Sequence, residues 1–209
     1  MSFKVLIIYI KIICFRIYNK HPMPTFKKYN LRLELGFGLL PIVSDKLENN
    51  LQTGVQKLRE DIKNEYGIYI PFIHIVDFVA LDIYEYSFFL NKKSMGKFRI
   101  KTEDINNSFN SESIKIILIN LNNIIINNLV EIFSCEYSNQ ILNIKKKYPK
   151  LFKCVLKNIS LSKIKFILSN ILSEKKSLVN IEKIFELIIS YSREIKDVKI
   201  MSEMIIENI

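Results

Sequence analysis

The sequence predicts an α+β fold that is predominantly α-helical, in which a small mixed α/β unit is followed by a helical bundle. Two observations lead to this prediction. Residues 31–110 combine strand-like runs with one amphipathic helix, whereas residues 111–209 carry apolar side chains at helical spacing. The chain has 209 residues, of which 49% are hydrophobic, and this is enough to bury a core. Five Gly and five Pro exclude a collagen-like or proline-rich chain.

Basic charge is concentrated at the start of the chain. The formal net charge is +10, and residues 1–30 hold six basic residues and no acidic one. We interpret residues 1–30 as a basic N-terminal segment and linker, followed by subdomains at 31–110 and 111–209. A basic segment can bind nucleic acid or an anionic membrane surface, although a solvated lysine-rich segment is the simpler interpretation. Only five of the 31 basic residues are Arg, the residue preferred for contacts to bases, so we expect no nucleic-acid partner.

An apolar run near the start, Val5–Phe15, is interrupted by Lys11. It is too short for a helix that spans a membrane, which needs about 20 apolar residues. A signal peptide would need an Ala-x-Ala-like cleavage site, and the only Ala of the chain is Ala80. The run fits an amphipathic surface anchor, a buried strand or a segment unrelated to the fold. Contact with a membrane through residues 1–20 is therefore one hypothesis.

Residue types that carry catalysis are sparse. The chain has two His and three Cys, and it contains no CxxC, HExxH, P-loop, GxSxG or GxGxxG motif. An odd number of Cys without a short spacing argues against a disulfide framework and a zinc site, and it fits a reducing cytoplasm. We therefore predict a protein that is not an enzyme, with no catalytic residue, no metal site and no cofactor.

The first subdomain is predicted from local patterns. Leucine alternates with charged residues over 31–35, which indicates a half-buried strand, and the two glycines around Phe37 indicate a turn of the backbone. Apolar residues at steps of three and four predict a helix over 51–66 that ends at Gly67, with Ser44 and Asp45 as capping residues.

Further strands are expected after this helix. Residues 69–79 are apolar with two interruptions, which predicts one or two strands. Tyr86–Leu90 and Lys97–Ile100 flank the sequence NKKSMG, and this arrangement predicts a hairpin.

Helices dominate the second subdomain. Residues 111–133 carry apolar side chains at helical steps after a Ser-x-Ser start. Three further helices are predicted at Ser138–Lys147, Ser162–Leu172 and Val179–Tyr191. Their apolar stripes are typical of a core, and we expect Leu168 and Phe185 to lie on facing stripes.

Four segments of the first subdomain follow one another in a recognisable order: LELGFGLLPIV, VQKLREDIKNEYG, IPFIHIVD and YSFFL. This order resembles the start of the cytoplasmic domain of the FlhA family, with its L-E-x-G-[YF]-G-L-[IL]-P stretch, a helix that ends in Gly and a P-P-x-x-I-R-D-N strand. The residues that fall on this pattern are Glu34, Gly36, Gly38, Leu39, Pro41, Pro71, Ile75 and Asp77.

The second subdomain resembles the same family, over stretches with the patterns Y-P-K-L-V, L-S-L-G-x-L-Q-x-V-L-Q-N-L-L and E-x-V-S-I-R-D-L-x-T-I-L-E. The matching residues are Tyr148, Pro149, Lys150, Leu151, Ser160, Leu161, Leu168, Asn170, Leu172, Ser177, Ile184 and Glu186. From both halves we select nine motif positions with an expected structural role: Glu34, Gly36, Gly38, Pro41, Asp77, Pro149, Leu161, Asn170 and Glu186.

The resemblance implies a non-enzymatic component of a flagellar-type type III protein export gate, located in the cytoplasm at the inner face of the bacterial inner membrane. It implies homo-oligomeric ring neighbours, export chaperone–substrate complexes and other export apparatus proteins as partners. Family members carry a membrane domain, a β-rich subdomain and a last α/β subdomain that have no counterpart here. We therefore expect a trimmed domain or a vestigial gene fragment, unable to replace a full-length family member. A basic helical nucleic-acid-binding protein is the alternative.

Overall fold

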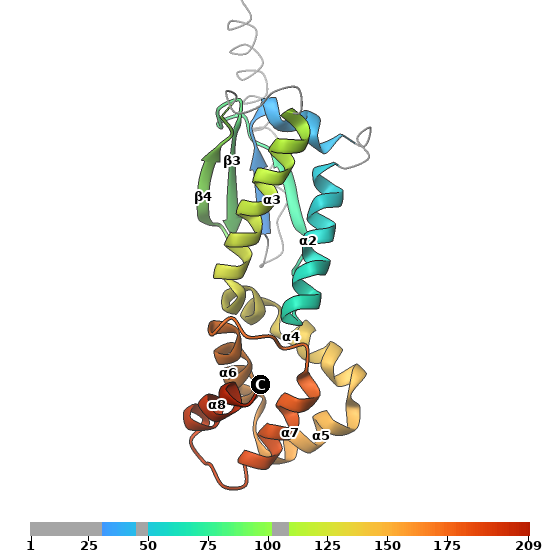
Figure 1. The fold of residues 1–209 in the computed structure, drawn as a ribbon, viewed down its shortest axis with the longest axis vertical. Coiled ribbons are helices and arrows are strands. Elements are labelled where there is room, and N and C mark those ends of the chain that lie inside the picture. The colour runs from blue at the N-terminus through green and yellow to red at the C-terminus, as the bar shows by residue number, and fades with distance from the viewer. Residues whose placement is uncertain (1–30, 45–49, 102–108) are drawn as a thin grey trace, which may run out of the picture. The chain divides into compact units, whose positions relative to one another are not determined.

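A computed structural model describes residues 31–44, 50–101 and 109–209 (Figure 1). The contacts divide the chain into two units that are interleaved in sequence. Of the described residues, unit 1 takes 31–44, 50–55, 72–101 and 109–121, and unit 2 takes 56–71 and 122–209. Each unit thus draws on both predicted subdomains, and their division at residue 110 stays a prediction. The basic segment 1–30 and its hypothetical membrane contact lie outside the described residues.

Unit 1 contains a mixed four-stranded sheet of order β2-β1-β3-β4. Its elements are β1 (Leu31–Leu35), the 3-10 helix η1 (Phe37–Val43), β2 (Ile73–Asp77), β3 (Glu85–Leu90), β4 (Lys93–Arg99) and the first parts of α2 (Leu51–Tyr66) and α3 (Phe109–Asn127). Strand β1 pairs with β2 in parallel and with β3 antiparallel, so β1 and β3 form the centre of the sheet.

One face of this sheet forms the core of unit 1. The three leucines of β1 are buried, and they pair with Tyr86, Phe88 and Leu90 of β3. Helix α3 lies across the sheet in Figure 1, and the Asn120 side chain donates a hydrogen bond of 2.7 Å to the Tyr86 hydroxyl. The predicted strand is thus confirmed, with its apolar side chains on this face, but it is not half-buried, because Glu34 on the opposite face is buried as well.

Residues 69–79 contain one strand, β2, in agreement with the prediction of one or two strands. The predicted hairpin needs a correction, because its second strand begins at Lys93 and the hairpin is therefore tighter than predicted. Only Asn91 and Lys92 form the turn, both with positive φ, at 51° and 76°. Positive φ at both residues is typical of the type I′ hairpin turn, whose twist matches that of the strands. The glycine of NKKSMG is therefore not the turn residue and lies within β4.

Unit 2 is helical. Besides the last parts of α2 and α3 it contains α4 (Leu129–Lys147), α5 (Pro149–Asn158), α6 (Leu161–Ser173), α7 (Ile181–Tyr191) and α8 (Val198–Glu207). Helix α6 packs mainly against α4 and α8, and α7 packs mainly against α5 and α8. The fold is therefore the predicted α+β fold dominated by helices. Leu168 and Phe185 are fully buried as predicted. Their helices, however, do not pack mainly against each other, as the prediction of facing stripes requires.

The predicted helix over 111–133 is wrong in one respect, because it is two helices. Helix α3 starts at Phe109 and ends at Asn127, and α4 then runs through the predicted start at Ser138. The Asn128 side chain donates to the Ile124 carbonyl at 2.7 Å, and such a local bond competes with the helical ladder.

Helices α5 and α8 were not predicted, and α7 begins two residues later than expected. Asn180 caps α7 and accepts from the Lys183 backbone N–H, so Val179 lies in the preceding loop. Asp197 caps α8 in the same way. The cap of α2 is Asn50, whose side chain accepts from Thr53 N–H at 2.9 Å, in place of the predicted Ser44 and Asp45.

Among the described residues, no single helix has the length and apolarity needed to cross a membrane. Helices α3 and α4 meet this criterion only as a pair, by length and composition, and the pair is bent by 75°.

Candidate functional site

Glu34 is the buried charge of unit 1. Its side chain is 6% exposed, and its carboxylate accepts a hydrogen bond from the Ser87 hydroxyl at 3.0 Å. The Arg32 guanidinium lies 2.9 Å away on the same strand and also stacks over the Phe89 ring, 4.7 Å from its centroid. A buried carboxylate needs such partners, because losing one leaves an uncompensated charge. This environment supports a structural role for Glu34.

Gly36 and Gly38 lie where the chain passes from β1 to η1 against the loop before β3. Their N–H groups donate to Glu85 and Ile83 carbonyls, both at 2.8 Å. A Cβ atom on Gly36 would lie 2.0 Å from the Asp82 carbonyl oxygen, a distance too short for two atoms that are not bonded. Glycine at this position therefore permits the backbone contact.

Pro41 and Asp77 complete the motif positions of unit 1, and both are exposed. Pro41 lies inside η1, where its carbonyl accepts from Ser44 N–H at 3.3 Å. Asp77 is the last residue of β2.

The four motif positions of unit 2 are spread over three helices, α5, α6 and α7, and none of them is fully buried. Pro149 is the first residue of α5 and is exposed. Leu161 opens α6 with 45% of its surface exposed, and its carbonyl accepts from the Tyr137 hydroxyl at 2.8 Å. Asn170 is half-buried in α6, and Glu186 is exposed in α7.

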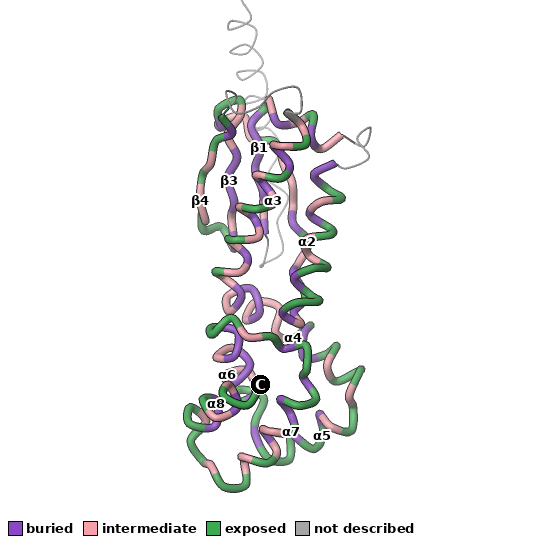
Figure 2. The backbone as a smooth tube through the Cα atoms, in the orientation of Figure 1, coloured by how far each residue is buried: buried purple, intermediate pink, exposed green. Residues whose placement is uncertain are grey.

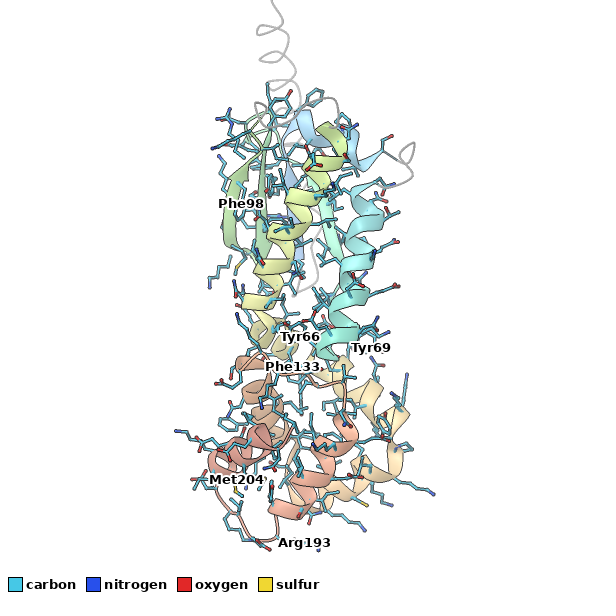
Figure 3. The ribbon with its side chains drawn as sticks, in the orientation of Figure 1. Tyr66, Tyr69, Phe98, Phe133, Arg193 and Met204 are labelled. Carbon is cyan, nitrogen blue, oxygen red and sulfur yellow. The ribbon has the colours of Figure 1, made fainter. Side chains whose placement is uncertain are left out.

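Unit 2 contains a pocket of about 260 Å³ between the end of α2, the end of α4 and the loop before α7. Figure 3 labels Tyr69 and Phe133, which belong to its wall. Its lining residues are Lys63, Asn64, Gly67, Tyr69, Phe133, Gln140, Asn143, Ile144, Lys147, Tyr148, Leu178, Val179 and Ile181.

Two side chains hold the segment after α2 against this pocket. The buried Gln140 amide donates to the Tyr69 carbonyl at 2.9 Å and accepts from the Tyr69 N–H at 3.2 Å. The Arg59 guanidinium donates two hydrogen bonds to the Ile70 carbonyl, at 2.9 and 3.1 Å. Since both peptide groups are bonded to side chains, the wall that carries the Tyr69 ring is preformed.

The loop before α7 closes the end of α2. Leu178 N–H donates to the Tyr66 carbonyl at 2.9 Å, and the Ser177 hydroxyl donates to the Glu65 carbonyl. These bonds satisfy carbonyls that a helix end leaves without an internal partner. Gly67 ends α2 with φ of +71°, and a Cβ there would lie 2.6 Å from the Val179 nitrogen. The loop and the helix end are thus one tightly fitted structure.

Two lysines flank the pocket and neither has a carboxylate partner among the described residues. The Lys63 ammonium lies 4.9 Å from the Tyr69 ring centroid, and the Lys147 ammonium lies 4.9 Å from that of Tyr148. Hydrogen bonding to Tyr148 and the charge effects of Tyr148 and the acid Glu182 raise the pKa of Lys147. The pocket therefore combines an apolar and amide lining with two positive charges, and it contains no acidic, His or Cys residue.

Comparison with known proteins identifies the family. The model of the FHIPEP family matches residues 18–113 and 107–209. The chain belongs to the FHIPEP family. It is 27% identical over 224 aligned residues to the flagellar biosynthesis protein FlhA of Borreliella burgdorferi, covering 88% of this chain and 32% of the relative. The chain thus spans about a third of the length of this curated relative, and the resemblance found in the sequence is confirmed.

Solved structures show the same fold. The Chlamydia pneumoniae CdsV protein aligns with a TM-score of 0.76 at 18% identity, over 88% of this chain and 66% of that one. The complex of CdsV with CdsO aligns with a TM-score of 0.73 at 19% identity, over 86% and 69%. The nonameric SctV-C of EPEC aligns with a TM-score of 0.72 at 19% identity, over 88% and 66%.

Sequence reasoning on this FHIPEP chain did not find the pocket. One signal was present: the buried apolar positions of α4 include Ile132, Phe133 and Ile141, and Gln140 occupies the same face. A polar residue on the buried face of a helix must find a hydrogen-bond partner, and here it fixes the pocket wall. Metal ligands do not gather anywhere in the described part of the chain, where no group of three His, Cys, Asp or Glu could hold an ion.

Proposed function

We propose that this chain acts as a non-enzymatic, cytoplasmic component of a flagellar-type type III protein export gate, at the inner face of the bacterial inner membrane. Its role is in protein export and flagellum assembly. The observation that carries this proposal is the FHIPEP match over two blocks in chain order, which together cover most of the sequence. The similarity to an FlhA protein favours a flagellar system.

The proposed activity is docking. SctV-C of EPEC is nonameric, and CdsV has a structure in complex with CdsO. By analogy, this chain contacts neighbouring copies in a ring and binds export chaperone–substrate complexes and other export apparatus proteins. Leu161 and Glu186 support this role, because both match the family pattern while their side chains face solvent in the described structure. Membrane contact through residues 1–20 remains part of the prediction.

Affinity capture from the organism that encodes the chain tests this function. The tagged chain, chemically cross-linked in cells, should enrich export apparatus proteins, export chaperones and further copies of itself. The matched control is Leu168→Asp, which places a charge at a fully buried position of α6 and should unfold the helical unit. Recovery of no export component beyond this control would contradict the proposal and favour a vestigial fragment.

A further inference from the structure

Charge is distributed unevenly along the described chain. From residue 137 to residue 173 there are eight lysines and no acidic residue, whereas the rest of 31–209 holds 17 basic and 21 acidic residues. The positive excess of 31–209 therefore comes entirely from this stretch, which belongs to unit 2. The eight residues are Lys145, Lys146, Lys147, Lys150, Lys153, Lys157, Lys163 and Lys165.

These lysines are available to a partner. All are exposed except Lys165, which is half-buried and donates to the Ser134 carbonyl at 3.5 Å. In the part of the chain that the structure describes, none of the eight pairs with a carboxylate. The one acid whose charge affects Lys147 is Glu182 of α7. Like charges without partners repel one another, so the folded unit gains nothing from this concentration.

Helix α5 presents the lysines in a row. Lys150, Lys153 and Lys157 follow one another at steps of three and four, which places them on one face of the helix. Phe152 and Val155 are buried on the other face. In Figure 2 most of α5 is exposed, so the row is on the surface of unit 2.

The row leads to the pocket. Lys147 lines the pocket, and only Tyr148 separates it from the first turn of α5. Lys63 contributes a second ammonium group from the end of α2. The interior between these charges is apolar, with Phe133, Ile144 and Leu178 among its residues.

We propose that this basic face, formed by the lysines of α4 and α5 and the adjoining pocket, binds an acidic segment of a partner protein. Carboxylates of the segment pair with Lys147, Lys150 and Lys153, and one apolar side chain of the segment enters the pocket. This proposal rests on the docking role proposed above, and it specifies the surface that binds the partner and the type of segment that is bound.

An acidic protein segment fits this face better than a membrane or a nucleic acid does. The pocket is lined by apolar side chains and side-chain amides, which match an apolar residue and a peptide backbone. A membrane surface, in contrast, is flat and offers no side chain that could enter the pocket. The charges are all lysine, without the arginines that bind phosphates bidentately.

No acidic segment of this chain is an obvious ligand for the basic face. Residues 1–30 contain no acid, and two acids of the acidic stretch 64–91, Asp82 and Glu85, already pair with Arg99 and Lys97.

Fluorescence anisotropy with a labelled synthetic peptide, a single phenylalanine within a run of glutamates, tests the proposal on the full chain. We expect binding that weakens with salt. Lys150→Glu with Lys153→Glu should reduce affinity at least about tenfold, a change of about 1.4 kcal/mol. The matched control Lys196→Glu with Lys199→Glu makes the same change of charge at two exposed positions, one just before α8 and one in its first turn, and should leave affinity within about twofold, as expected for an exposed charge outside the contact.

Val179 tests the pocket separately because its side chain is 54% exposed and lines the cavity. Val179→Glu should reduce peptide binding, whereas Val179→Lys should preserve it, and replacing the peptide's phenylalanine by serine should weaken it. Equal binding by both double variants would overturn the proposal. So would tighter binding of phosphatidylglycerol vesicles or a single-stranded oligonucleotide than of the peptide, or a self-association that Lys150→Glu with Lys153→Glu abolishes. Peptide binding is measured without export proteins, so its failure is distinguishable from failure of the proposed function.

Discussion

The motif positions of the two units differ in what surrounds them. In unit 1, Glu34 is buried and bonded, and Gly36 permits a backbone contact that no other residue would allow. In unit 2, Leu161 and Glu186 face solvent, and the core consists of residues such as Leu168 and Phe185. One family pattern thus has two physical explanations. Packing explains Glu34 and Gly36 of unit 1, although Pro41 and Asp77 of the same unit are exposed, whereas we propose that Leu161 and Glu186 of unit 2 match the pattern because they contact other molecules.

The largest effect on stability should come from the core of unit 2. Leu168→Ala and Phe185→Ala each delete a fully buried side chain, and the Phe185 ring also lies 6.1 Å from that of Phe152. We expect each substitution to lower the free energy of unfolding by about 2–5 kcal/mol, measured by urea titration. A loss below about 0.5 kcal/mol would mean that these stripes are not core.

The next effect should come from the motif of unit 1. Gly36→Ala places a Cβ atom 2.0 Å from a backbone carbonyl, which can move only with the loop before β3. We expect a loss of about 1–3 kcal/mol in the same titration, the usual result of forcing an extra methyl group into a packed site. If Gly36→Ala is as stable as the parent, the structural explanation for unit 1 is wrong.

The sequence predicted those features of the fold that arise from a regular pattern. Helix α2 has its predicted bounds, because its apolar steps are regular and Gly67 ends it. The turn at Asn91–Lys92 was not predictable in the same way, because Lys92 takes positive φ where a glycine is usual. No helix was predicted at Pro149, although proline at the first position of a helix is common and here begins α5.

The candidate site was less predictable than the fold. The pocket is lined by residues that are far apart in the sequence. Tyr69 and Gln140, for example, are joined by hydrogen bonds between the Gln140 side chain and the Tyr69 backbone. No local pattern contains that pairing. The lysine stretch is visible in the sequence, but its lack of carboxylate partners among the described residues is a property of the structure.

A smaller, pH-dependent effect should arise where α4 meets Leu161. Burial raises the pKa of Tyr137 from 10.0 to about 12. The unfolded chain ionises this group near pH 10, so its contribution to stability is complete below pH 10 and is lost as the pH rises to about 12. Stability of the parent should therefore fall more steeply across this range than that of Tyr137→Phe, which cannot ionise. Parallel curves in urea titrations from pH 9 to pH 12 would contradict this.

The smallest effect on stability is expected at the exposed motif positions of unit 2. Leu161→Ala and Glu186→Ala should each change the free energy of unfolding by less than about 0.5 kcal/mol, because both are exposed positions outside the core. Both variants should nevertheless recover less of the export partners than the parent does in the cross-linked affinity capture. Lys183→Ala, an equally exposed change on α7, serves as the matched control and should recover as much as the parent. A large loss of stability at Leu161 or Glu186 would place them with the structural positions of unit 1. Full stability together with unchanged capture would leave the match at these two positions without a physical cause and would remove the contrast between the units.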